Sequence, residues 1–127
     1  RIRQLLSAAD IQFIPEYEEP LPNISLFLEN ILSMCLKEAV TNIVKHSGAT
    51  QCTLRVVESH DSLRFVLSDN GKGIPKDYRK SKGSGLIGIR ERLDFVNGEL
   101  GIEGEGGTTL TMSVPKVIKD TNREGYN

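Results

Sequence analysis

A long stretch of the chain repeats its hydrophobic residues at the spacing of an α-helix. Between residues 25 and 46 the apolar positions recur at Leu28, Leu32, Cys35, Leu36, Ala39 and Ile43. This period places the apolar side chains on one face of a helix. Asn23 or Ser25 can cap the start of the helix, and Ser47-Gly48 can end it. The pattern predicts an amphipathic helix over residues 25–46.

A different period follows, in which hydrophobic and polar residues alternate. The runs at 52–57 (CTLRVV) and 63–68 (LRFVLS) are separated by the turn sequence SHDS. Alternation by two is typical of strands with one buried face, so the two runs predict a hairpin. A sheet built this way has one open face, and we expect helices to cover only the other face.

Weaker patterns complete the predicted order of elements. The remaining elements are expected at 1–9 (the end of a helix), 10–17 (a strand), 86–98 (a helix), and 99–105 and 108–115 (two strands). Pro15 restricts the strand that contains it to a sheet edge. This order predicts an α/β two-layer sandwich with a mixed sheet and helices on one face, rather than a doubly wound parallel sheet.

Composition narrows the class of protein without identifying a function. The chain has 127 residues, of which 38% are hydrophobic and 26% charged, as expected for one globular domain. A net charge of -1 provides no basic field, so no nucleic-acid partner is expected. Cys35 and Cys52 lie within apolar patterns and are expected to be reduced core thiols of a cytoplasmic domain. No apolar run approaches the roughly 20 residues of a bilayer span, so no membrane contact is expected for this part.

Polar residues border the apolar face of the long predicted helix. Glu38, Asn42, Lys45 and His46 lie within about a quarter of the helix circumference. An Asn one turn after a Glu suits a hydrated Mg²⁺, because the amide oxygen can bind the ion while the carboxylate orients a water or accepts a proton. Lys45 can meet phosphate as a point charge. A solvated helix face explains this stripe equally well when it is taken alone.

The stretch LSDNGKGIP places a carboxylate at the end of a strand. Asp69 follows the buried alternation, so its side chain is expected to lie partly inside. A carboxylate there can accept a hydrogen bond from an exocyclic amine, which distinguishes adenine from guanine. Gly71 and Gly73 let the backbone turn and approach a flat ring. An ordinary D-N-G turn between strands remains the alternative.

Three further glycines, Gly83, Gly85 and Gly88, surround the start of the second predicted helix. Glycines at a helix start allow backbone N–H groups to point at phosphate oxygens. The segment is not a P-loop, because it lacks G-x-x-x-x-G-K-[ST]. It does not follow a strand directly within a βαβ unit either, which argues against a dinucleotide-binding fold.

The ordered combination of these segments is more specific than any one of them. E-x-x-x-N on a helix, D-x-G-x-G after a strand, G-x-G-L-x-G at a helix start and G-G-T before a last strand resemble the motifs of the GHKL ATPase superfamily, which has the Bergerat ATP-binding fold. The segments KEAVTNIVKHS, GSGLIGIRERL and GGTTLTMSVP resemble segments of the catalytic domain of bacterial sensor histidine kinases. Within that group they resemble the DesK-like subfamily, which is partnered by NarL-type regulators. The resemblance covers residues 10–115.

The resemblance implies ATP and Mg²⁺ as ligands and suggests roles for the helix residues. Asn42 would bind the Mg²⁺ that bridges the ATP phosphates, and Glu38 would be the acidic catalytic partner. Lys45 and His46 would lie on the phosphate side.

The same resemblance suggests which residues contact the adenine base and which residues form the ATP lid. Asp69 would accept the adenine amine, with Thr108 sharing a bridging water, and Gly71 and Gly73 would shape the base pocket. A short ATP lid and further ATP contacts would come from Gly83, Gly85, Leu86 and Gly88.

The phosphoryl acceptor is expected elsewhere. The histidines of this chain are His46 and His60, and neither has the helical context of an acceptor. The resemblance implies an acceptor histidine on an upstream dimerisation domain, with residues 1–9 as the end of the linker and 116–127 as a flexible tail. Because the chain begins without Met, we expect it to be a piece of a longer protein, with any membrane anchor in the missing part. The alternative is an anti-sigma-factor-type serine kinase or a nucleotide-binding regulatory module.

Overall fold

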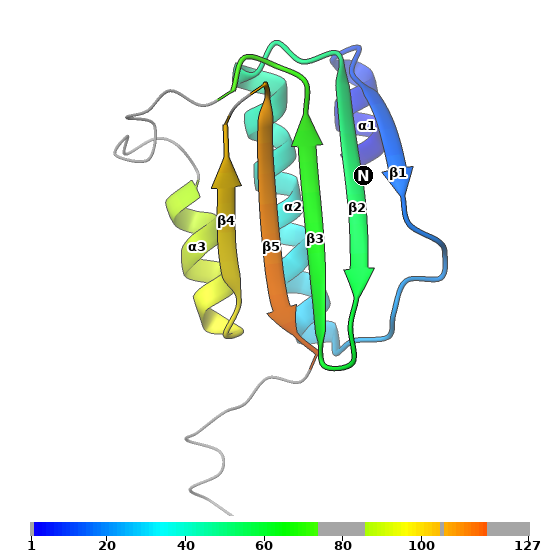
Figure 1. The fold of residues 1–127 in the computed structure, drawn as a ribbon, viewed down its shortest axis with the longest axis vertical. Coiled ribbons are helices and arrows are strands. Elements are labelled where there is room, and N and C mark those ends of the chain that lie inside the picture. The colour runs from blue at the N-terminus through cyan, green and yellow to red at the C-terminus, as the bar shows by residue number, and fades with distance from the viewer. Residues whose placement is uncertain (1, 74–85, 105, 117–127) are drawn as a thin grey trace, which may run out of the picture.

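A five-stranded sheet forms one layer of the molecule, and the helices pack on one of its faces (Figure 1). The computed structural model describes residues 2–73, 86–104 and 106–116. In chain order the elements are α1 (Ile2–Ala8), β1 (Gln12–Glu16), α2 (Leu26–His46), β2 (Gln51–Glu58), β3 (Ser62–Asp69), α3 (Leu86–Phe95), β4 (Glu99–Glu103) and β5 (Thr108–Pro115). The strand order is β1-β2-β3-β5-β4, with β1 parallel to β2 and the other pairs antiparallel. The predicted α/β sandwich with a mixed sheet is confirmed.

Helix α2 forms because its sequence supplies both a cap and a continuous apolar face. The Ser25 hydroxyl accepts a hydrogen bond from the Leu28 backbone N–H at 3.1 Å, which satisfies a donor that the first turn leaves free. The fully or nearly buried positions of the helix are Leu28, Leu32, Cys35, Ala39, Val40 and Ile43. Leu36, expected on this face, is only half-buried, and Val40 takes a place in the core instead.

The alternation of β3 determines where its last residue points. Leu63, Phe65 and Leu67 are buried on the side that faces the helices. Asp69 is two residues further on and is therefore in phase with this core face. It is paired with Cys52 of β2 on one side and with Thr108 of β5 on the other. The strand itself thus carries a carboxylate into the interior at its end.

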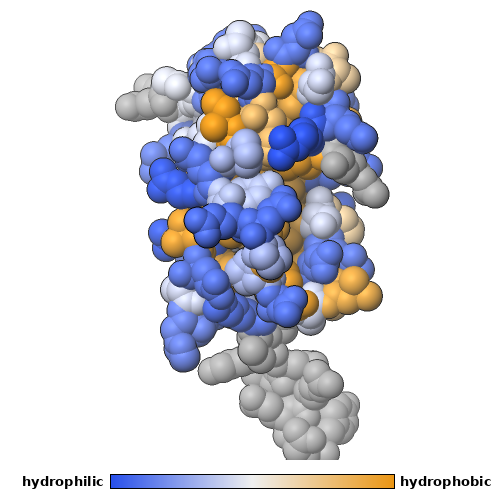
Figure 2. Space-filling model, turned by 90° about the vertical axis from the view of Figure 1, so that its right-hand side faces the viewer, coloured by the Kyte–Doolittle hydropathy of each residue, from blue (hydrophilic) through white to orange (hydrophobic). Residues whose placement is uncertain are grey.

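The edges of the sheet differ from the predicted boundaries in detail. β1 lies at an edge, as Pro15 indicated, but it begins at Gln12 because Asp10 adopts φ 58° in the turn after α1. The parallel pairing of β1 with β2 spans the whole of α2, which local patterns do not encode. Figure 2 faces this edge, where hydrophobic surface shows between charged side chains. Here the Arg3 guanidinium lies 4.9 Å from the centre of the Phe13 ring, a cation–π contact.

A residue in the left-handed conformation closes the turn after α3. Asn97 adopts φ 59°, and the Gly98 N–H donates to the Leu93 carbonyl at 2.7 Å. This left-handed closure satisfies a carbonyl that the last helical turn leaves free. Among the described residues, no helix is both long and apolar enough to cross a bilayer.

Candidate functional site

Three elements meet at one end of the sandwich and enclose a cavity. α2 and β3 both end there and β5 begins there (Figure 1). The cavity has a volume of about 440 Å³, within the usual range for small-molecule sites. Its lining residues are Ala39, Asn42, Ile43, His46, Ser47, Asp69, Lys72, Gly73, Leu86, Thr108 and Leu110. Four segments far apart in the sequence therefore contribute to one pocket, since Leu86 is the first residue of α3.

Asp69 is the buried charge of this pocket. Its exposed fraction is 7%, and its Oδ1 accepts a hydrogen bond from the Gly71 backbone N–H at 2.7 Å. Burial raises the pKa of the Asp69 carboxyl above its usual value, and hydrogen bonds from the Gly71 and Thr108 backbones partly oppose that rise. The turn thus orients the carboxylate before any ligand arrives. Such a desolvated acceptor favours a hydrogen-bond donor on the ligand.

Cys52 lies beside Asp69 on the neighbouring strand. The thiol is fully buried, and burial, with a smaller contribution from the Asp69 charge, raises its pKa to about 12. Cys35 is also free and buried, and burial raises its pKa to about 11. Both thiols are therefore neutral at physiological pH and behave as small core residues.

Helix α2 supplies the polar wall of the cavity. Asn42 and His46 lie one turn apart and line it, and Ala39 and Ile43 add apolar surface beside them. The apolar lining from α2, together with Leu86 and Leu110, suits a flat hydrophobic ring. His46 is exposed at the rim, while Asn42 is half-buried.

Two of the helix residues predicted for the site do not line the cavity. At about 100° per residue, Glu38 and Lys45 lie roughly 40° and 60° from Asn42 on one side, whereas His46 lies about 40° away on the other side. The cavity opens on the side of His46 and the apolar face. Glu38 is half-buried and Lys45 is exposed, and both lie outside the lining.

The predicted glycines divide into three groups. Gly73 lines the cavity, and Gly71 lies behind the lining, packed against Ser47. Gly88 is in α3 and borders a separate surface groove with Arg92 and Phe95. Gly83 and Gly85 lie outside the described residues. Of the other predicted residues, Leu86 and Thr108 line the cavity.

Sequence reasoning missed two polar lining residues, Ser47 and Lys72. Ser47 was assigned only as the end of the helix, yet it is buried, with an exposed fraction of 6%. Lys72, between the glycines of the turn after β3, brings a positive charge to the cavity. A signal was present for both, because each is adjacent to a residue already assigned to the site.

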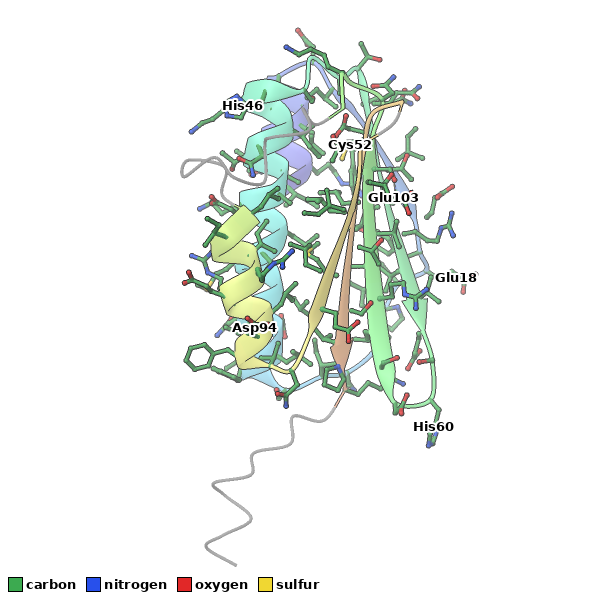
Figure 3. The ribbon with its side chains drawn as sticks, turned by 60° about the vertical axis from the view of Figure 1, so that its left-hand side comes forward. Glu18, His46, Cys52, His60, Asp94 and Glu103 are labelled. Atoms are coloured by element: carbon green, nitrogen blue, oxygen red, sulfur yellow. The ribbon has the colours of Figure 1, made fainter. Side chains whose placement is uncertain are left out.

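The histidines lie at opposite ends of the molecule. His46 lies at the cavity end of α2, and His60 lies in the turn between β2 and β3 at the far end (Figure 3).

The amino-acid sequence of this chain matches one protein family and several named proteins. The family described as histidine kinase-, DNA gyrase B- and HSP90-like ATPase matches residues 28–118. The chain is 53% identical over 118 residues to the sensor histidine kinase DesK of Bacillus subtilis, an alignment that covers 93% of this chain and 32% of that protein. It is 41% identical to the sensor histidine kinase YvfT of the same organism, with 93% and 31% covered. The chain thus spans about a third of the length of these relatives.

Solved structures of histidine kinase and ATP-binding domains have the same fold as this chain. The catalytic domain of the histidine kinase ThkA matches with a TM-score of 0.75 and 20% identity, covering 93% of this chain and 92% of that one. The ATP-binding domain of PrrB from Mycobacterium tuberculosis matches with a TM-score of 0.71 and 25% identity, covering 91% and 94%. DesK and YvfT are sensor histidine kinases, which confirms the resemblance to that class of protein drawn from the motifs and does not favour the anti-sigma-factor alternative. The chain belongs to the histidine kinase-, DNA gyrase B- and HSP90-like ATPase family, in its sensor histidine kinase branch.

Proposed function

We propose that this chain binds ATP with Mg²⁺ in the cavity between α2, β3 and β5 and presents the γ-phosphoryl group to a histidine on a separate dimerisation domain. The observation that carries the proposal is that Asp69, buried at the end of β3, and Asn42, on α2, line the same cavity. These residues come from two different motifs of an ATPase family and are brought together by the fold. ATP supplies the transferred group and its leaving group, while the chain's residues bind, orient and neutralise charge.

Asp69 suits the base end of the nucleotide. Its carboxylate is desolvated and already oriented by the Gly71 N–H at 2.7 Å. An acceptor so placed recognises the exocyclic amine of adenine and repels the carbonyl that guanine carries at the same position. Thr108, paired with Asp69 across the sheet, is suitably placed to share a water bridge to the base.

Asn42 suits a Mg²⁺ ion carried by the phosphates. The described residues contain no cluster of three His, Cys, Asp or Glu side chains, so they offer no cage made of protein ligands alone. Mg²⁺ is normally held by one or two protein oxygens with waters and substrate phosphates. The donor set of this cavity, with the Asn42 amide at its wall, fits that mode of binding.

Cationic and acidic groups complete the phosphate side. Lys72 and His46 line the cavity, and Lys72 can neutralise phosphate charge directly. Lys45 at the exposed end of α2 would add to this field. We assign Glu38, one turn before Asn42, the role of orienting a water or accepting a proton near the ion. Gly83 and Gly85 stay predictions for the lid.

The rest of the reaction needs a partner. We propose that residues 1–9 connect to an upstream dimerisation domain that carries the acceptor histidine, and that residues 10–115 form the catalytic unit. The phosphoryl group would then pass to a response regulator of NarL type, and the complete protein would be anchored in a membrane. The relatives named above are described as sensor histidine kinases, which supports this arrangement.

Labelling with γ-32P-labelled ATP tests the proposal. This chain, incubated with Mg²⁺ and labelled ATP, should bind nucleotide but acquire little covalent label. A longer version with the upstream helices should be labelled on histidine, which is recognised by its acid-labile phosphate. Strong label on the short chain, or no nucleotide binding by it, would contradict the proposal.

A further inference from the structure

The two halves of the proposed site are carried by different elements. Asn42 belongs to α2, whereas Asp69 ends β3, and the chain between them contains the loop after α2 and the whole β2–β3 hairpin. A nucleotide that engages both residues needs a fixed distance between them. The structure contains a joint at the point where the end of α2 touches the turn after β3, built around Ser47 and Asn70.

Ser47 uses every polar atom it has at this joint. Its hydroxyl donates to the Ile43 carbonyl at 2.6 Å and accepts from the Ala49 N–H at 3.0 Å. Its backbone N–H also donates to Ile43, at 3.1 Å, and its carbonyl accepts from the Lys72 N–H at 2.9 Å. The first three contacts fix the end of α2, and the last attaches that end to the turn that follows Asp69.

Close packing reinforces the attachment. A Cβ added to Gly71 would collide with the Ser47 carbonyl oxygen and would lie 2.8 Å from the Ser47 Cβ and 2.9 Å from Asp69 Oδ1. The turn therefore presses directly on the helix end, with no space for a side chain. The same Gly71 also donates its N–H to Asp69, so the base-binding carboxylate and the helix end are in contact through one residue.

Asn70 holds the outer side of the same turn. Its Oδ1 accepts from the N–H groups of Thr50 and Gln51, at 2.8 and 3.0 Å. Its Nδ2 donates to the Thr50 hydroxyl at 2.9 Å. Asn70 thus ties the turn to the loop that leaves α2. Its side chain is absent from the cavity lining, and it is exposed.

We propose that Ser47 and Asn70 are positioning residues that hold Asp69 and Asn42 at the separation at which the base and the Mg²⁺-bound phosphates of one nucleotide bind together. This inference rests on the proposed function and deepens it. Neither residue needs to reach the reacting atoms. Loosening the joint should leave each half able to bind its own part of the ligand while weakening the binding of both parts at once.

Calorimetry with adenosine, ATP, and ATP plus Mg²⁺ tests this on Asn70→Ala. In the wild type, Mg²⁺ should tighten ATP binding, and we call this ratio of affinities the Mg²⁺ gain. Asn70→Ala should reduce the Mg²⁺ gain by roughly tenfold while leaving adenosine affinity within about threefold, because couplings between neighbouring sites are of this size. Asn70→Asp keeps the acceptor oxygens for Thr50 and Gln51, so it should restore most of the gain.

Two controls separate positioning from general stability. Ser59 lies at the opposite end of the hairpin and bonds Ser62 through its hydroxyl at 2.5 Å. Ser59→Ala should change the melting temperature without changing the Mg²⁺ gain. In an Asn42→Ala background, Asn70→Ala should have no further effect on the gain, because the residue through which it acts is gone. Ser47→Ala should reproduce the effect of Asn70→Ala if the variant folds.

The outcomes distinguish the two levels of the proposal. A wild type without nucleotide binding or without a Mg²⁺ gain would overturn the proposed function, and the joint with it. A normal wild type with an unchanged gain in Asn70→Ala would overturn the joint alone. Equal losses for adenosine and for ATP plus Mg²⁺ in Asn70→Ala would also overturn it, because they would indicate a damaged base pocket rather than lost coupling.

Discussion

Replacing the buried carboxylate by its neutral amide, Asp69→Asn, changes one atom at the proposed base contact. Asn keeps an oxygen that can accept the Gly71 N–H now bonded at 2.7 Å. Its second position carries an NH₂ group in place of a carboxylate oxygen. Because this NH₂ group can only donate, it cannot accept a hydrogen bond from the adenine amine. It can, however, donate one to the guanine carbonyl. The variant should lose affinity for adenosine and lose its preference for ATP over GTP.

The expected loss of adenosine affinity in Asp69→Asn follows from the charge and the burial of this side chain. A hydrogen bond to a charged group contributes about 1.5–3 kcal/mol, and Asp69 is only 7% exposed, so water screens it little. Each 1.4 kcal/mol is tenfold in affinity, so the Kd for adenosine should rise about 10- to 150-fold. The GTP affinity should stay the same or improve.

The direction of the pKa shift adds a pH dependence. Because burial raises the pKa of Asp69 above 3.8, the carboxylate accepts a proton at a higher pH than an exposed Asp does. The ionised form binds the amine, so adenosine affinity should be full above the raised pKa and should be lost as the pH falls through it. Adenosine avoids the titration of phosphates, and the Asn variant reports any titration of the base itself.

Isothermal titration calorimetry of wild type and variant with adenosine, ATP and GTP, at several pH values, measures the affinities, the preference for ATP over GTP and the pH dependence. Melting temperatures check that the variant is folded. An Asp69→Asn protein that is folded and still prefers ATP over GTP as strongly as the wild type would refute the base contact. A pH profile identical in wild type and variant would refute the role of the ionised carboxylate.

Further expectations concern the metal, the backbone and the thiols. Asn42→Ala should weaken ATP binding by roughly tenfold in Mg²⁺ and little in its absence, measured by calorimetry, since one ligand of the ion is removed; equal losses in both conditions would contradict this. Gly107 has φ 113°, and an added Cβ would collide with the Asp69 carbonyl oxygen, so Gly107→Ala should lower the free energy of unfolding by about 1–3 kcal/mol in urea denaturation. Gly101→Ala, where the nearest atom to the new Cβ is 3.6 Å away, is the matched control, and equal stabilities of the two variants would contradict the reasoning. The two buried cysteines, with thiol pKa values of about 11 and 12, should resist a thiol reagent in the native protein and react on unfolding; fast native labelling would contradict their burial.

The sequence allowed most of the fold to be predicted, because its periods are local. The spacing of apolar residues identified α2, and the alternation of β3 predicted that Asp69 would lie partly inside. The parallel pairing of β1 with β2 was beyond local patterns, since it joins strands on either side of a helix. The side of α2 that faces the cavity was also beyond them, because helical spacing fixes angles between residues and leaves the position of the sheet open. Glu38 and Lys45 were therefore placed with Asn42 although the cavity opens on its other side.

The contact between Ser47 and Lys72 shows the same limit at atomic scale. Each residue could be assigned locally, one as a helix end and the other as part of a glycine turn. Their hydrogen bond at 2.9 Å joins segments separated by a hairpin, and it exists because the hairpin brings the end of β3 back beside the end of α2. The residues that hold a site together across such distances are visible only in the fold.

An NMR titration of the 15N-labelled chain with ATP and Mg²⁺ shows whether Asp69 and Asn42 bind one nucleotide together. We expect the backbone amides around Asp69 and the side-chain amide of Asn42 to shift together and to saturate at the same nucleotide concentration. The shift of Asn42 should depend on Mg²⁺. Shifts that cluster elsewhere, or that involve one of these residues without the other, would contradict this expectation.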